Sequence, residues 1–116
     1  MLNRSQDIFE NLKERGIDVH FPGHHQGECD APYVVVKYTG SSQISTYSST
    51  QATYNLIVYV PVLQYAMFET FIDEVKNKMK PMEPMIMPTH FISDPFYDEQ
   101  VKAHSVSIQY RNARKI

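Results

Sequence analysis

Two segments of the chain carry apolar residues at helical spacing. In residues 5–15, Ile8, Phe9 and Leu12 form one stripe, and Gly16 follows as a residue type that commonly ends a helix. In residues 63–80, the apolar residues fall on one face of a helix and are Phe68, Phe71, Ile72, Val75 and Met79. Acidic residues precede basic ones in both segments, which suits the helix dipole. We therefore predict two amphipathic helices.

Alternating or β-branched residues predict strands in five other segments. These segments are residues 17–21, 33–39, 50–60, 89–92 and 101–111. The alternation is clearest in the third segment, residues 50–60. The residues predicted to face the core are Ala52, Tyr54, Leu56, Val58 and Val60. The opposite side carries Ile57 and Tyr59 and is half apolar, so we expect something to cover it.

Turns and prolines separate these elements. Residues 24–32 read as a polar loop, residues 41–49 as the tip of a long hairpin, residues 81–88 as an extended connector with three prolines, and residues 93–100 as an acidic turn. Consecutive strands joined by short turns predict an antiparallel sheet, and the two helices are expected to pack on one face of it. A length of 116 residues suits one core, so we predict a single α+β domain over residues 1–116.

Charge and composition narrow the classes of function. A net charge of −2 cannot neutralise many phosphates, so we expect no specific nucleic-acid binding and interpret Arg111, Arg114 and Lys115 as a solvated tail. The longest apolar run, residues 56–63, is far shorter than the roughly 20 residues of a membrane span, so we expect no membrane partner. The single cysteine, Cys29, excludes an internal disulfide and fits a soluble protein of a reducing cytosol.

Residues 38–68 contain no charged residue and no histidine, although 21% of the chain is charged. Solvated faces normally carry charge, whereas the centres of protein–protein contacts are depleted in charge and enriched in tyrosine. We interpret this neutral segment as a contact surface between subunits; the alternative is an ordinary Ser/Thr-rich hairpin. The candidate contact residues are Tyr38, Ile44, Tyr47, Gln51, Thr53, Ile57 and Tyr59.

A cluster of histidines and the cysteine is the clearest candidate for other chemistry. His20, His24, His25 and Cys29 lie close together in the sequence, and zinc prefers nitrogen and sulfur ligands of these types. Their spacing matches no standard zinc finger or ribbon, so the alternative is a polar loop. We expect no cofactor and keep a small metal-binding or metal-dependent enzyme module as the second hypothesis.

Catalytic motifs are otherwise missing from the sequence. His90 and His104 would need to meet across the last hairpin to act as an acid–base pair, and Cys29 would need a nearby base to act as a nucleophile. No nucleophile elbow, phosphate-binding loop or dinucleotide fingerprint is present. The prediction is that the protein is not an enzyme.

The order and texture of the elements resemble a known family. A short first helix leads to P-Y-V-V-V-K-Y, a long polar hairpin and T-Y-N-L-I-V-Y-V; the helix F-E-T-F-I-D-E-V-K-N-K-M and the segment D-P-F-Y-D-E-Q-V-K-A-H-S-V-S-I-Q-Y-R follow. This pattern resembles the tail-terminator and tail-completion proteins of long-tailed bacteriophages and prophages, also called minor capsid or head–tail joining proteins. The likeness covers nearly the whole chain, and no single motif anchors it.

The resemblance implies a structural role in the virion. Proteins of this family form rings, commonly hexamers, at the head-proximal end of the tail tube, where they end tube growth and meet the head connector. It implies that the chain binds itself, the tail-tube protein and the head connector protein, without catalysis, first in the host cytoplasm and then in the neck of the virion. The loop with His24, His25 and Cys29 departs from the family pattern.

Overall fold

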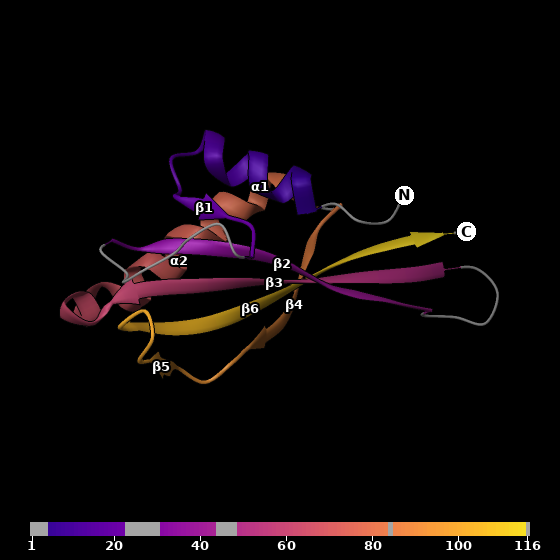
Figure 1. The fold of residues 1–116 in the computed structure, drawn as a ribbon. Helices are drawn as coiled ribbons and strands as arrows, with labels where there is room; N and C mark the ends of the chain where they lie inside the picture. Colours follow the sequence, from indigo (N-terminus) through magenta and orange to yellow (C-terminus); the bar gives the residue numbers. More distant parts are fainter. Residues whose placement is uncertain (1–4, 23–30, 44–48, 84, 116) are drawn as a thin grey trace.

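The computed structural model describes residues 5–22, 31–43, 49–83 and 85–115. Within these residues, two α-helices, two short 3₁₀ helices and six strands follow one another (Figure 1). They are α1 (Ser5–Glu14), β1 (Val19–His20), β2 (Tyr33–Gln43), β3 (Ser49–Pro61), η1 (Val62–Met67), α2 (Phe68–Met79), η2 (Lys80–Met82), β4 (Met87–Ile92), β5 (Phe96–Asp98) and β6 (Ala103–Lys115).

All six strands belong to one sheet in the order β1-β2-β3-β6-β4, with β5 also paired to β6. The pairs β2–β3, β3–β6 and β4–β6 are antiparallel, as predicted for this sheet, and the unpredicted strand β5 is also antiparallel to β6, whereas β1 runs parallel to β2. The prediction of a wholly antiparallel sheet was therefore wrong at its first strand. Residues 21–32 join β1 to β2, and this length of about a dozen residues is what a parallel connection needs.

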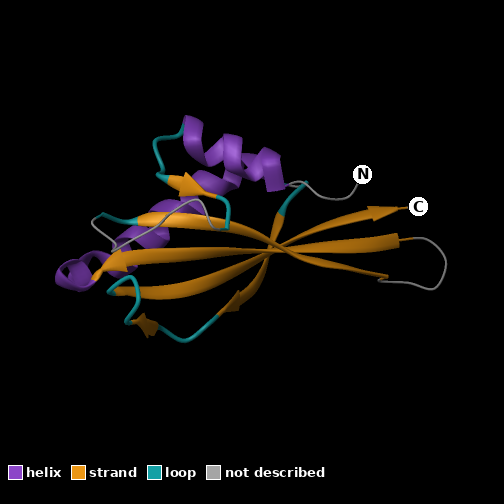
Figure 2. Ribbon diagram, in the orientation of Figure 1, coloured by secondary structure: helices purple, strands orange, loops and turns teal. Residues whose placement is uncertain are grey.

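The two helices pack on one face of the sheet, which confirms the predicted α+β fold (Figure 2). The core-facing residues of β3 are the alternating set predicted from the sequence, and all five are fully buried. Ile8 and Leu12 of α1 and Val75 and Met79 of α2 meet them from the helical side. Each buried aliphatic side chain contributes about 1.5–3 kcal/mol to folding, so this face supplies most of the stability.

The end of α1 is fixed against α2. Gly16 has a φ of +88°, a conformation that glycine adopts without a steric cost, and its amide donates to the Lys13 carbonyl at 3.2 Å. The Asn11 side-chain amide donates to the Lys78 carbonyl oxygen at 2.9 Å, and the Lys78 ammonium donates to the Arg15 carbonyl oxygen at 3.1 Å. The two bonds that involve Lys78 fix the helices relative to each other.

The second helix begins later than predicted. Residues 62–67 form the 3₁₀ helix η1, in which Gln64 departs from helical geometry with φ −114° and ψ 25°. The apolar periodicity begins at Phe68, and no side chain caps the helix before it. Residues 62–67 therefore have no core-facing stripe to hold them in a regular α-helix.

Three strands are longer than predicted. β2 reaches Gln43, β3 begins at Ser49 and β6 continues to Lys115, in segments whose polar residues show no alternation. Arg114 and Lys115 pair through their backbones with Thr50 and Ser49, so the C-terminal segment is a strand and not the predicted tail. A two-stranded hairpin is marginal alone, and β6 supplies the third strand that stabilises it.

Candidate assembly surfaces at the two ends of the molecule

A three-stranded ribbon extends beyond the helices at one end of the molecule. We call it the arm; it consists of residues 39–43, 49–53 and 111–115 (Figures 1 and 2). It accounts for the elongated shape, which measures 49 × 25 × 24 Å. The two β2 and β3 segments of the arm belong to the neutral segment recognised in the sequence.

A β-bulge marks the base of the arm. Tyr38 pairs with Tyr54 and Gly40 pairs with Thr53, which leaves Thr39 as the extra residue. The Thr39 Oγ1 lies 2.8 Å from the Thr53 Oγ1 and donates to the Thr53 carbonyl oxygen at 3.0 Å. These contacts hold β2 and β3 together where the ribbon leaves the helix-covered body.

The outer edge of β2 is long and largely unpaired among the described strands. β1 pairs with β2 only at Val34 and Val35, and no other strand in the described ranges adds to this side of residues 37–43. An exposed strand edge is a template for pairing with a further chain. The arm therefore offers backbone groups as well as side chains to a partner.

The seven candidate contact residues separate into three groups. Tyr38, Gln51 and Thr53 lie at the base of the arm or within it, with Tyr38 36% exposed beside the buried ring of Tyr54. Ile57 and Tyr59 lie on the helix-free face of the body, both half-buried. The remaining two, Ile44 and Tyr47, fall outside the described residues.

Part of the cover that Tyr59 was expected to need comes from its own chain. Its ring stacks on Tyr33 with centroids 4.8 Å apart, and Val35 and Val101 pack against the same small cluster. Ile57 lies between Val35 and its β6 partner on the same face. This face is thus a partly filled apolar surface.

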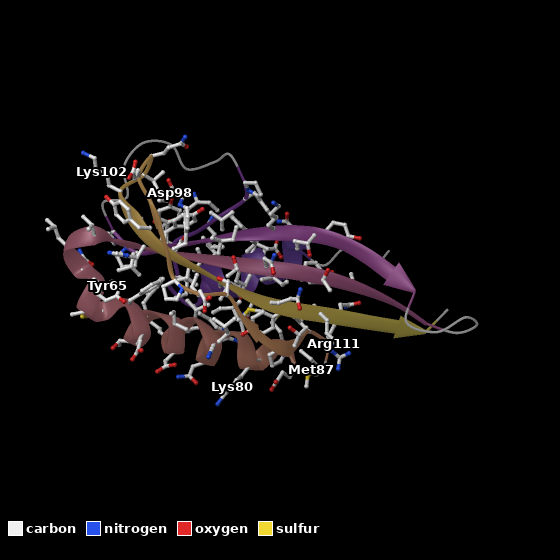
Figure 3. The ribbon with its side chains drawn as sticks, turned by 90° about the horizontal axis from the view of Figure 1, so that it is seen from below. Tyr65, Lys80, Met87, Asp98, Lys102 and Arg111 are labelled. Atoms are coloured by element: carbon white, nitrogen blue, oxygen red, sulfur yellow. The ribbon has the colours of Figure 1, made fainter. Side chains whose placement is uncertain are left out.

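The opposite end of the molecule carries the largest exposed apolar side chains, which sequence reasoning missed. Leu63 is 96% exposed and Phe96 is 64% exposed. We call this region the apolar end; it consists of Leu63, Tyr65, Met67, Ile92, Phe96 and Tyr97. Figure 3 shows Tyr65 at the end away from the arm. Contiguous exposed apolar surface marks interaction sites in soluble proteins.

An aromatic cluster and a groove organise the apolar end. The imidazole of His104 lies 4.5 Å from the Tyr65 ring and 5.3 Å from the Tyr97 ring, measured between centroids. A groove of about 350 Å³ runs beside it between the start of α2 and the segment from β4 to β5. Its apolar lining consists of Tyr65, Phe68, Ile72, Ile92, Pro95 and Val106.

The sequence did contain a signal for the apolar end. The neutral segment continues through residues 62–67, where charge would be expected on an exposed helical turn. Sequence reasoning assigned these residues to the first turns of a helix and so gave them no role of their own. The exposed residues of β5 stood in a predicted acidic turn, where nothing indicated a strand.

The structure brings no metal-ligand set together among the described residues. The His20 Nε2 lies 3.0 Å from the Asp18 Oδ1, and its ring meets the edge of Tyr33 at 5.5 Å. The other three candidate ligands, His24, His25 and Cys29, lie outside the described residues.

The strand register does not bring His90 and His104 together, as an acid–base pair would require. Pro88 and Ile92 of β4 face Tyr110 and Ile108 of β6, so His90 lies opposite that part of the strand. His104 instead pairs with Tyr97 of β5. The register therefore separates the two histidines along β6.

A second cavity, of about 300 Å³, lies between α2, β4 and β6 near the base of the arm. Met79, Ile108 and Tyr110 form its apolar wall, with Lys80 and Glu83 at its polar side. Burial, with a smaller contribution from the nearby Glu83 carboxylate, raises the pKa of Tyr110 to about 12. The Tyr110 hydroxyl therefore stays protonated at neutral pH and cannot act as a base there.

Comparisons with known proteins identify no relative. No protein-family model matches the chain, and no curated protein matches its sequence. In the described part of the chain, no helix has the length and apolar character to cross a membrane.

Proposed function

We propose that this chain is a non-enzymatic assembly protein that forms an oligomeric ring, caps a phage or prophage tail tube and joins it to the head connector. The observation that carries the proposal is the arm, a ribbon built from neutral strands that extends beyond the helix-covered core (Figure 1). The resemblance of the element order to tail-terminator proteins supplies the biological setting. No bond is made or broken in this role.

The energetics of the arm support an assembly role. Ordering each residue of a ribbon that extends beyond the helices costs about 1–2 kcal/mol of backbone entropy. The arm also presents strand edges that soluble monomers usually shorten, charge or cover. Lys37 is the only charged residue between Tyr33 and Gln43, so charge protects this edge little. A partner that binds the arm offsets the entropy of ordering and covers the strand edges.

A ring explains how one small chain could both end the growth of the tail tube and bind the head connector. Each subunit of a ring contacts its neighbours through different surfaces, and the two faces of the ring are chemically distinct. One face matches the last layer of the tube, so binding removes the template for further growth. The other face differs from the tube and offers a new surface to the connector.

The direct test is the solution mass of the purified full-length protein, followed by its binding to tail tubes. We expect native mass spectrometry to give one discrete oligomer, a hexamer by the resemblance, and electron microscopy to show rings bound at one end of tubes from the encoding phage. A protein that stays monomeric up to millimolar concentration and leaves both tube ends bare would overturn the proposal.

A further inference from the structure

The molecule has opposite charge at its two ends. The arm strands contain Arg111, Arg114 and Lys115 and no acidic residue. The apolar end is bordered by the acidic residues Glu69, Asp94, Asp98 and Glu99, with Lys102 as the basic residue on the β5–β6 turn. Figure 3 shows Asp98 and Lys102 at the end with Tyr65, and Arg111 toward the arm.

The second helix repeats this asymmetry along the same axis. α2 starts beside the groove of the apolar end with Glu69 and finishes toward the arm with Lys76 and Lys78 in its last turn. The acidic start and the basic finish thus strengthen the separation of charge between the two ends. The field of such an elongated molecule favours alignment of copies with unlike ends adjacent.

The two ends also differ in the groups that they offer to a contact, and these groups are complementary. The apolar end supplies side chains, namely exposed aliphatic and aromatic groups around an open groove. The arm supplies uncharged strands in residues 39–43 and 49–53, and the outer edge of its β2 segment pairs with no strand in the described ranges. A segment without charged residues can enter an apolar groove without burying an unpaired charge, which would cost free energy at an interface.

We propose that the arm of one copy lies on the apolar end of the next copy, with the groove lined by Tyr65, Phe68 and Ile92 as its seat. This inference rests on the proposed ring and specifies its contact. Because the two surfaces differ, the contact is heterologous: each copy gives its arm to one neighbour and receives the arm of the other. Repetition of this contact closes a ring when the rotation between copies allows it.

Charge decides between the three ways in which two copies can meet. An arm-to-arm contact brings the basic residues of both copies together, and an end-to-end contact brings Asp94, Asp98 and Glu99 of both together. Like charges at a contact select against that contact. Only the arm-to-end contact places opposite charges beside each other.

Two complementary variants test the proposal. The arm variant carries Arg111→Glu and Arg114→Glu, and the end variant carries Leu63→Asp and Phe96→Asp, whose native side chains are exposed enough for the change to leave the fold intact. We expect each variant alone to be monomeric. An equimolar mixture should give a 1:1 dimer and nothing larger, since only the arm of the end variant and the apolar end of the arm variant remain functional.

The possible results separate the two proposals. If the unmodified protein never assembles, the ring itself is wrong. If it assembles but the mixture stays monomeric, or if either variant forms homodimers alone, the ring stands and the arm-to-end contact is wrong. Asn77→Asp, which adds a negative charge at an exposed position of α2, should assemble normally. Circular dichroism confirms folding, and Leu63→Asp alone replaces the double variant if that one unfolds.

Discussion

The arm and the apolar end offer different chemical groups to a partner, although both contain parts of the same neutral segment. The arm offers mainly backbone groups, because no strand in the described ranges pairs with the outer edge of β2 at residues 39–43. The apolar end is mainly side chain, with Leu63 almost fully exposed. The comparison teaches that absence of charge indicates a contact surface, while the local structure decides whether backbone or side chains make the contact.

The base of the arm separates residues that hold the fold from residues that face a partner. Tyr54 is fully buried and Tyr38 beside it is 36% exposed, with ring centroids 5.6 Å apart. We expect Tyr54→Ala to lower the free energy of unfolding by about 4 kcal/mol, because it leaves a cavity in the core. Tyr38→Ala should cost less than about 1 kcal/mol. Urea unfolding monitored by circular dichroism measures both.

The same pair also distinguishes stability from assembly. Tyr38→Ala should weaken oligomerisation while leaving the monomer folded. Equal losses of stability in the two variants would mean that Tyr38 belongs to the core, and the base of the arm would then not divide the two roles.

A charge placed on the neutral surfaces should weaken assembly by about a hundredfold, or ~2.7 kcal/mol, because an unpaired charge would be buried at the contact. The variants are Ile57→Asp, on the half-buried helix-free face, and Tyr47→Asp, at a position outside the described residues. Sedimentation velocity over a range of concentrations measures the change. Ile57→Val is the matched control, and assembly of both aspartate variants at the unmodified affinity would refute the assignment of these residues to contacts.

Alkaline pH should lower the free energy of unfolding through Tyr110, at the base of the arm. Tyr110 pairs with Tyr54 in the sheet, and burial raises its pKa to about 12 from an ordinary value of 10. The neutral form is favoured in the folded state, so its stabilisation is complete below pH 10 and is lost as pH rises through about 12. The loss approaches about 2 kcal/mol. Unfolding curves between pH 8 and pH 12 measure it, and Tyr110→Phe should remove this component of the pH dependence.

Particular residues show what the sequence could and could not predict. The five buried residues of β3 and the stripe of α2 have strong periodicity, and Gly16 has the conformation that its residue type favours, so these features were predicted correctly. The outer parts of the arm strands carry almost no apolar residues, so no alternation marks them, whereas Ala52 at the base of the arm is buried in the core. Their pairing, including Ser49 with Lys115, comes from tertiary contacts that no local pattern records.

The apolar end was missed for a related reason. Leu63 and Tyr65 are apolar residues next to a real helix, so periodicity alone could not separate η1 from α2. The direction of β1 depends on how residues 21–32 cross to β2, which no spacing rule specifies. Of the predicted site residues, the structure places those at the base of the arm and on the helix-free face. The role of each remains a prediction.

The smallest expected effect concerns the charges that border the apolar end. Asp98 and Glu99 are on or beside the β5–β6 turn, and Figure 3 shows Asp98 at this end of the molecule. Asp98→Asn together with Glu99→Gln should weaken association about threefold to fivefold, since exposed ion pairs contribute about 0.2–1 kcal/mol each.

Glu14→Gln, at an exposed position of α1, is the matched control and should leave the association constant unchanged. Stopped-flow mixing at about 50 mM and about 500 mM NaCl extends the test, because the screening length falls from about 14 Å to about 4 Å over this range. The difference between the unmodified protein and the double variant should shrink at high salt. A difference that persists there would mean that the two residues act by shaping the turn, and the apolar end would then need its side chains alone to select the arm.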